Sequence, residues 1–195
     1  INESAGGLIG ICGSSTVITN CYSGGNVTGY YYVGGFIGYH ETGSKITACY
    51  TKGTTKGNGG VGGFCGLTNG TIENCYAWNN VTRVSGSTET QIGSFIGQTS
   101  NATVNHCYTL GTVTYTGATN PTDKGFIGTN SGSLTAVNNI NGSEITLQPT
   151  GYGANAISNV NMKKMKTYTD YGWDFMCETT IGINDYWGIN TTDNN

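Results

Sequence analysis

Short apolar clusters recur along this chain at nearly even spacing, separated by glycine and polar residues. A phrase of two glycines, two apolar residues and a glycine starts at positions 6, 34, 62, 93 and 124, so successive copies are 28, 28, 31 and 31 residues apart. Ser94 and Lys124 each replace one glycine in the last two copies. Repeats of this length are typical of solenoids, in which each unit buries its apolar face only against its neighbours.

A second phrase, cysteine followed by tyrosine, recurs at a similar distance after the first phrase in four of the five units. Equivalent positions of a solenoid stack, so the phrase predicts a structural column of one residue per unit: Cys21, Cys49, Cys75, Cys107 and, in the fifth unit, Asn139. Two interpretations stay open. The cysteines are small buried thiols, or adjacent coils are joined by disulfides, for which the strand spacing of about 4.8 Å is short enough.

Each unit is expected to hold two or three short strands, in the first unit around residues 8–9, 18–22 and 27–28. Strict alternation would point Ile18 and Cys21 to opposite faces, so we place a bend near Asn20, a residue type that tolerates left-handed backbone geometry. We attribute the abundant glycine to corners that need positive φ. The sequence therefore predicts an all-β fold, a parallel β-solenoid (β-helix) of about five coils of 28–31 residues over residues 1–147.

The repeat pattern ends near Gln148. Apolar residues at near-helical spacing predict one short helix over 158–168, and Trp173 and Trp187 follow it. Large aromatic residues after the last coil suit a cap over the open end of a stack. We therefore expect residues 148–195 to form a capping segment with one short helix and a Trp-rich end.

Charge and composition narrow the choice of partners. The chain has 33 glycines, 8 Lys and Arg against 11 Asp and Glu, and a net charge of −3. It has no basic stripe for a phosphate backbone, so we expect no nucleic acid partner. It also has no apolar run long enough to span a bilayer, so we expect no membrane insertion.

The two phrases together resemble the GLUG motif, which occurs in tandem in bacterial surface and secreted proteins, among them adhesin-like proteins and non-catalytic parts of immunoglobulin-cleaving proteases. The resemblance covers nearly the whole chain, and the tryptophan-containing end is similar to the segment that often closes such arrays. It implies an extracellular location, on the cell surface or secreted, and names no catalytic residues.

The residues themselves predict no catalytic, cofactor or metal site. The acidic residues fall at different stations of the repeat, His40 and His106 stand alone, and there is no C-x-x-C pair. Binding is the better prospect, because Tyr30, Tyr31, Tyr32 and Trp78 offer aromatic side chains for carbohydrate or protein. The alternative is that these tyrosines pack between coils.

We therefore expect an extracellular structural or adhesive module, a rigid stalk or fibre subunit that presents a binding surface. Its expected partners are a host-surface or matrix protein or glycan, or copies of itself that stack on an uncapped N-terminal coil. A carbohydrate-binding module is the alternative function. A polysaccharide-degrading β-helix enzyme is the remote one.

Overall fold

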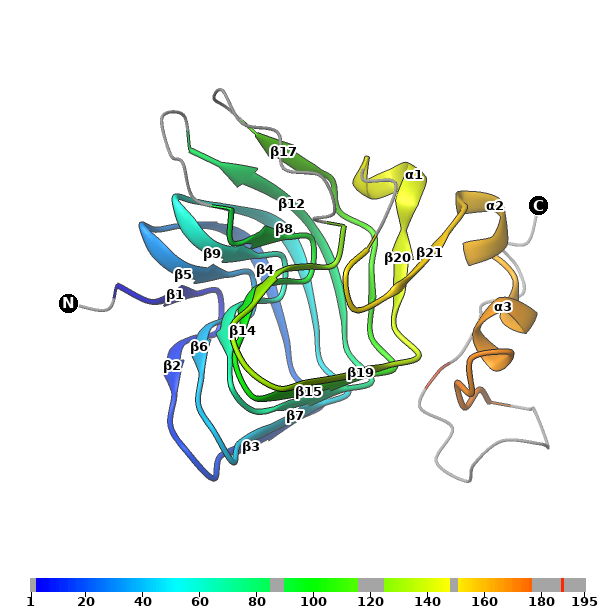
Figure 1. Ribbon diagram of the computed structural model, residues 1–195, viewed down its shortest axis with the longest axis horizontal. Coiled ribbons are helices and arrows are strands. Elements are labelled where there is room, and N and C mark those ends of the chain that lie inside the picture. Colours follow the sequence, from blue (N-terminus) through cyan, green and yellow to red (C-terminus); the bar gives the residue numbers. More distant parts are fainter. Residues whose placement is uncertain (1–2, 85–89, 116–124, 148–150, 177–186, 188–195) are drawn as a thin grey trace.

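The computed structural model describes residues 3–84, 90–115, 125–147, 151–176 and 187. The chain winds through four parallel sheets, which we call A to D in the order in which each turn passes through them (Figure 1). Every strand pairs with its equivalents in the neighbouring turns, so backbone groups are satisfied between turns. The predicted parallel β-solenoid is confirmed.

The strands divide among the sheets as follows. Sheet A contains β1 (Ala5–Gly6), β5 (Tyr31–Gly34), β9 (Gly59–Gly62) and β13 (Ile92–Gly93). Sheet B contains β2 (Ile9–Cys12), β6 (Ile37–His40), β10 (Cys65–Thr68), β14 (Ile96–Thr99) and β18 (Ile127–Asn130). Sheet C contains β3 (Val17–Thr19), β7 (Lys45–Thr47), β11 (Thr71–Glu73), β15 (Ala102–Asn105) and β19 (Leu134–Val137). Sheet D contains β4 (Tyr22–Thr28), β8 (Tyr50–Gly57), β12 (Tyr76–Arg83), β16 (Tyr108–Thr109), β17 (Val113–Tyr115), β20 (Ile140–Gly142) and β21 (Asn155–Ile157).

Four turns have strands in all four sheets, and the fifth contributes β18, β19 and β20 within the described residues. A turn therefore holds four strands, one or two more than expected. The difference arises from sheet A, whose strand in the first turn, β1, was not expected. The segment predicted as one strand, 18–22, is cut by a corner, but its second part joins residues 27–28 in the single strand β4.

The corner between sheets C and D is a single left-handed residue. Asn20 has φ of 54°, and the equivalent residues of the next four turns, Ala48, Asn74, His106 and Asn138, have φ between 50° and 57°. This residue resets the alternation of side chains, so both Ile18 and the cysteine after the corner face the interior.

Columns of equivalent apolar residues fill the interior. The rings of Phe36, Phe64, Phe95 and Phe126 stack with centroids 4.8, 5.0 and 4.8 Å apart and are fully buried. Cys65 lies in register between Ile37 and Ile96 and is fully buried, as an apolar substitute should be. The turns therefore share one continuous core.

The glycines of the repeated phrase serve a different purpose from the one expected. None of those in residues 34–38 has a left-handed φ. A Cβ at Gly34 would lie 1.9 Å from the carbonyl oxygen of Ile37, and one at Gly35 would lie 2.2 Å from that of Gly63. Our attribution to positive φ is wrong for this phrase: its glycines are required because backbone approaches backbone too closely for any side chain.

The C-terminal part also differs from expectation. The single helix predicted over 158–168 is two short helices, α2 (Asn159–Met162) and α3 (Met165–Thr169), because Lys164 between them is extended. The break allows the Tyr168 hydroxyl to donate to the Met162 carbonyl oxygen at 2.9 Å, with both side chains buried. A further short helix, α1 (Ser143–Thr146), lies before the expected end of the repeats. None of the helices among the described residues is long and apolar enough to cross a membrane.

The capping aromatic residues cover the side of the stack. The segment at its end is 151–157, whose strand β21 pairs with β20 and whose Tyr152 carbonyl oxygen accepts from the Ile127 N–H. Trp173 and Phe175, by contrast, pack with Tyr108 and Tyr168 against the last strands of sheet D, and α2 and α3 lie beside that sheet (Figure 1). The division of the chain at residue 147 stays a prediction.

Candidate binding face

The predicted column of cysteines lies inside the corner between sheets C and D. The N–H of Cys21 donates to the Cys49 sulfur at 3.4 Å, and the N–H of Cys49 donates to the Cys75 sulfur at 3.4 Å. The column ends where Cys107 donates its N–H to Asn139 Oδ1 at 3.0 Å. All four cysteines are free thiols, and only Cys21 is not fully buried.

The surroundings of these thiols oppose reactivity. A side-chain hydrogen bond from the Cys49 thiol to Cys75, together with burial, raises the pKa of Cys49, and burial raises the pKa of Cys75. The thiolate, which is the nucleophile and the metal ligand, is therefore disfavoured. Asn139 closes the column by donating its amide to the carbonyl oxygens of Val104 and Gly153, which joins the last turn to the segment at the end of the stack.

The four aromatic residues predicted as a binding site lie in two places. Tyr30, Tyr31 and Tyr32 form a cluster at the corner from sheet D to sheet A, where Tyr30 is 51% exposed and packs edge-on against Tyr31 at 4.8 Å. Tyr32 instead packs against Tyr39, with the ring centroids 6.0 Å apart. Trp78 belongs to sheet D and is 51% exposed.

Sequence reasoning missed a ladder of tyrosines on the outside of sheet D. Tyr22, Tyr50, Tyr76 and Tyr108 stack with ring centroids 5.3, 4.9 and 4.9 Å apart and nearly parallel planes. Tyr22 is 66% exposed and Tyr50 36%. The signal was present in the repeated Cys-Tyr pair: once the cysteine faces inward, strand alternation turns the tyrosine outward.

Three further rows of outward side chains run beside the ladder, in register from turn to turn. The first contains Gly24, Lys52 and Trp78, the second Asn26, Thr54 and Asn80, and the third Thr28, Lys56, Thr82 and Thr114. Lys52 Nζ lies 4.4 Å from the centre of the Trp78 ring, a cation–π contact. The Thr54 hydroxyl donates to Asn26 Oδ1 at 2.7 Å.

The C-terminal cap limits how much of this surface is open. Tyr108 packs against Tyr168, Trp173 and Trp187, and burial raises its pKa. Tyr76 approaches Trp187 at 6.3 Å, whereas Tyr22 and Tyr50 contact only other tyrosines among the ring pairs of the described residues. We call the open part, the outward side chains of β4, β8 and β12 from Tyr22 to Thr82, the sheet D face.

Two comparisons with known proteins bear on the repeats. Residues 29–55 and 57–82 each match the family described as the GLUG motif. This chain contains GLUG repeats. Each matched segment spans one turn of the solenoid, from sheet A to the strand of sheet D, so Lys52 and Trp78 of the sheet D face lie inside GLUG repeats. No sequence among the curated proteins matches this chain.

A solved structure shares the architecture of the GLUG-repeat chain. The crystal structure of a Bacteroides ovatus protein named a "putative immunoglobulin A1 protease" has 26% sequence identity and a TM-score of 0.51. The match covers 69% of this chain and 46% of that chain. This chain therefore spans less than half of the length of the Bacteroides ovatus protein.

The two histidines of the GLUG-repeat chain lie in separate places, each at least half buried. His40 is fully buried, its Nδ1 lies 2.9 Å from the Thr68 hydroxyl, and burial lowers its pKa to about 4. His106 lies elsewhere, against Trp173 and the Asn138 amide, where burial lowers its pKa although Glu73 opposes the shift. Among the described residues no group of three His, Cys, Asp or Glu side chains could hold a metal ion.

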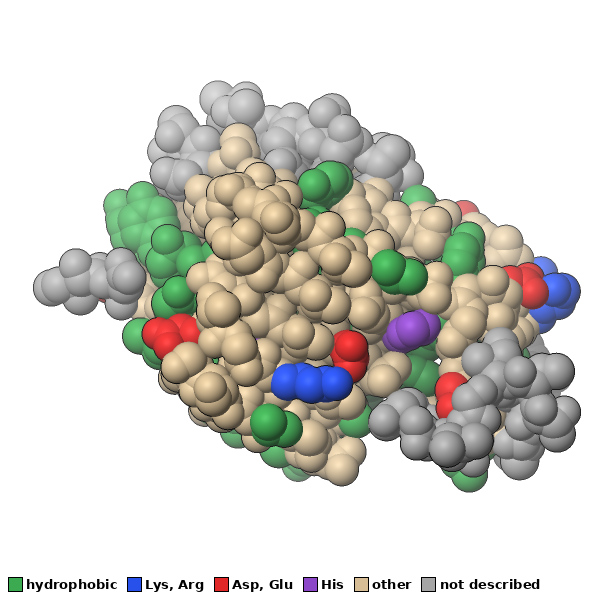
Figure 2. Space-filling model, turned by 60° about the horizontal axis from the view of Figure 1, so that its bottom comes forward, with side chains coloured by type: hydrophobic (Ala, Val, Ile, Leu, Met, Phe, Trp, Pro, Cys, Tyr) green, Lys and Arg blue, Asp and Glu red, His purple; other side chains and the backbone are tan. Residues whose placement is uncertain are grey.

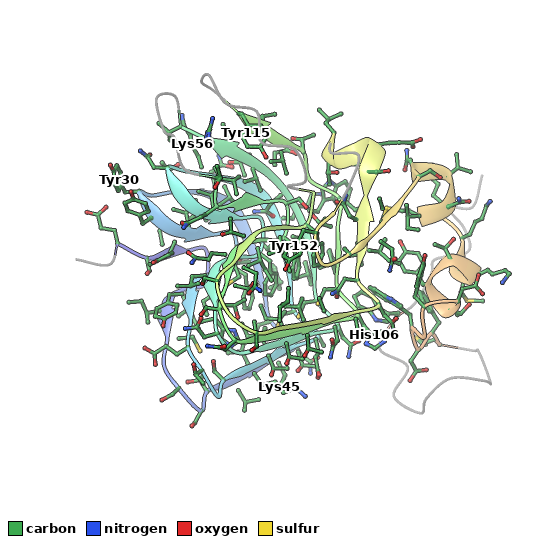
Figure 3. All side chains as sticks on the ribbon, viewed as in Figure 1. Tyr30, Lys45, Lys56, His106, Tyr115 and Tyr152 are labelled. Carbon is green, nitrogen blue, oxygen red and sulfur yellow. The ribbon has the colours of Figure 1, made fainter. Side chains whose placement is uncertain are left out.

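Charge is sparse on the side of the molecule where sheet C lies. Figure 2 brings this side forward and shows mostly backbone and uncharged, non-hydrophobic side chains there. Lys45 and Glu73 pair there at 2.7 Å. In Figure 3, Lys45 lies at the lower side of the body and Lys56, of the sheet D face, at the upper side. Sheet C therefore serves as a reference surface for tests of the sheet D face.

Proposed function

We propose that this chain is an extracellular structural and adhesive module, a stiff solenoid that presents the sheet D face to a partner. The observation that carries the proposal is the exposed, in-register array of Tyr22, Tyr50, Lys52 and Trp78 on the outside of the stack. Exposed aromatic side chains grouped with polar ones are typical of interaction surfaces. GLUG repeats are typical of extracellular bacterial proteins, which supports the location.

Stiffness supports the same proposal. Strands of sheet D bond to their equivalents over up to eight successive residues, and the phenylalanine column ties the turns together beneath them. Side chains held in this way lose little conformational freedom when a partner binds, so less of the contact energy is spent on ordering them. A rigid body also holds the face at a constant distance from whatever carries the module.

We propose that the described part of the chain is not catalytic. The activity in the name of the Bacteroides ovatus protein is that of a protein more than twice as long as the matched region. In this chain the buried His40 is kept neutral, the thiols of Cys49 and Cys75 are kept protonated, and Glu41 accepts a hydrogen bond from the N–H of Ser14 at 2.9 Å. These surroundings favour structural roles over proton transfer or nucleophilic attack.

The test is capture of ligands by the immobilised protein from an array of glycans and extracellular-matrix proteins. We expect at least one ligand whose capture is lost in the double variant Tyr50→Ala, Trp78→Ala. The matched control is Thr71→Ala, Thr103→Ala, which removes two outward side chains from sheet C. If no ligand on the array distinguishes the two variants, the proposal is wrong. Light scattering on the same protein tests the predicted self-association through the first turn.

A further inference from the structure

We infer that the sheet D face binds an acidic polysaccharide, a chain of uronic-acid sugars that lies along the solenoid axis. The inference rests on the proposed function, because it names the class of ligand that the same face takes. Three features support the inference: the positive charge of the face, the asparagine amide groups that are available as donors, and the pairing of a lysine with an exposed tryptophan.

The charge of the face has one sign. The outward side chains of β4, β8 and β12 include Lys52 and Lys56 and no carboxylate, although the whole chain has a net charge of −3. Both lysines are exposed, and neither forms a salt bridge with another described residue, whereas Lys45 and Lys166 do. A ligand that brings carboxylates therefore meets two available ammonium groups and no like charge.

The two asparagines of the face, Asn26 and Asn80, present their amide donors to a ligand. Asn26 Oδ1 accepts from the Thr54 hydroxyl, and Asn80 Oδ1 accepts from the N–H and hydroxyl of Thr112 at 3.1 and 2.9 Å. Both amide oxygens are thus occupied, while the two Nδ2 groups have no partner among the described residues and lie in exposed side chains. Donors of this kind match the carboxylate and hydroxyl oxygens of a sugar acid.

Lys52 and Trp78 form the centre of the face. The ammonium group lies 4.4 Å from the indole centre, and the tryptophan remains half exposed. A sugar ring packs its apolar C–H groups on an aromatic side chain while a carboxylate on the same ring reaches an adjacent ammonium group. The pair therefore offers both contacts that a uronic acid needs.

The shape of the face favours a linear ligand. Its rows run along the solenoid axis, and equivalent side chains repeat at the strand spacing of about 4.8 Å. The stacked tyrosines cover one another's ring faces, so the ladder presents ring edges and hydroxyls. Bases of a nucleic acid need open ring faces and many phosphate contacts, which makes a single-stranded nucleic acid the poorer match.

The experiment is isothermal titration of the full chain with four probes: hexagalacturonate, its methyl ester, cellohexaose and a deoxythymidine oligonucleotide. We expect binding of hexagalacturonate only, weakened by added salt. Lys52→Met and Trp78→Ala should each raise Kd about tenfold or more. Lys45→Met, the same change on sheet C, should leave Kd within about twofold because Lys45 lies outside the sheet D face, and the loss of its surface ion pair with Glu73 costs little stability.

The outcomes separate this inference from the function on which it rests. If hexagalacturonate fails to bind while the array still yields a ligand that needs Trp78, the inference is wrong and the proposed function stands. Equal binding of the methyl ester, or of the oligonucleotide, also overturns the inference. Circular dichroism checks the fold of each variant, and Lys56→Met replaces any variant that does not fold.

Discussion

Replacing the buried histidine His40 by threonine should remove the acid sensitivity that this residue gives to the fold. His40 lies in register between Cys12 and Thr68 in sheet B and is fully buried. Nδ1 has the Thr68 hydroxyl beside it, while Nε2 has no hydrogen-bond partner among the described residues. Burial lowers its pKa from 6.5 to about 4. Threonine is the residue that the next turn already places at this position.

The size of the stability loss follows from the difference between the pKa of His40 in the folded chain and its pKa in the unfolded chain. The unfolded chain takes up the proton near pH 6.5 and the folded chain only near pH 4, so stability is full above 6.5 and is lost as the pH falls toward 4. Integrating between the two pKa values gives a loss of about 1.4 kcal/mol at pH 5.5 and about 3 kcal/mol at pH 4. The same proton linkage is absent from His40→Thr.

Urea denaturation of both proteins at pH 7, 5.5 and 4 measures this loss. His40→Thr should be less stable at pH 7, because the smaller side chain leaves a cavity, but the difference between the proteins should shrink or reverse at pH 4. His106 and the carboxylates are present in both proteins, so their contributions cancel. Parallel pH profiles would refute the reasoning, since they would mean that His40 titrates normally in the folded chain.

Three further predictions concern the columns and corners. Phe64→Ala removes the middle of the phenylalanine stack and should cost about 3–5 kcal/mol in urea denaturation; a loss below about 1 kcal/mol would mean that the turns do not share a core. Ala48→Asn should stabilise the fold by about 0.5–1 kcal/mol, because Ala48 has φ of 53° and asparagine tolerates this geometry better; a lower melting temperature would contradict it. Of the column thiols, only Cys21 should react with a thiol reagent in the folded protein, and rapid labelling of Cys75 would contradict its burial.

The candidate face illustrates where prediction from the sequence stopped. Trp78 was selected because of its residue type, and the structure places it half exposed on sheet D. The tyrosines chosen with it, Tyr30 to Tyr32, belong to another corner, and the ladder that includes Tyr50 was missed. Whether a tyrosine faces out depends on the corner before it. The bend expected near Asn20 is confirmed at that residue, but its consequence for the tyrosine two positions later was not drawn.

The amino-acid sequence by itself determined the repeat and hence the stack. Units that recur every 28–31 residues can bury their apolar positions only by placing equivalents in register, so the columns of phenylalanine and cysteine follow from spacing alone. Only the tertiary structure decided which residues line the outer surface, why the glycines of residues 34–38 are needed, and where the capping aromatics pack. The left-handed corner was expected near Asn20, but the side chains that stay open to solvent depend on the cap that packs over the later turns. The glycines depend on backbone segments that approach across the stack. Neither contact is a property of a local pattern.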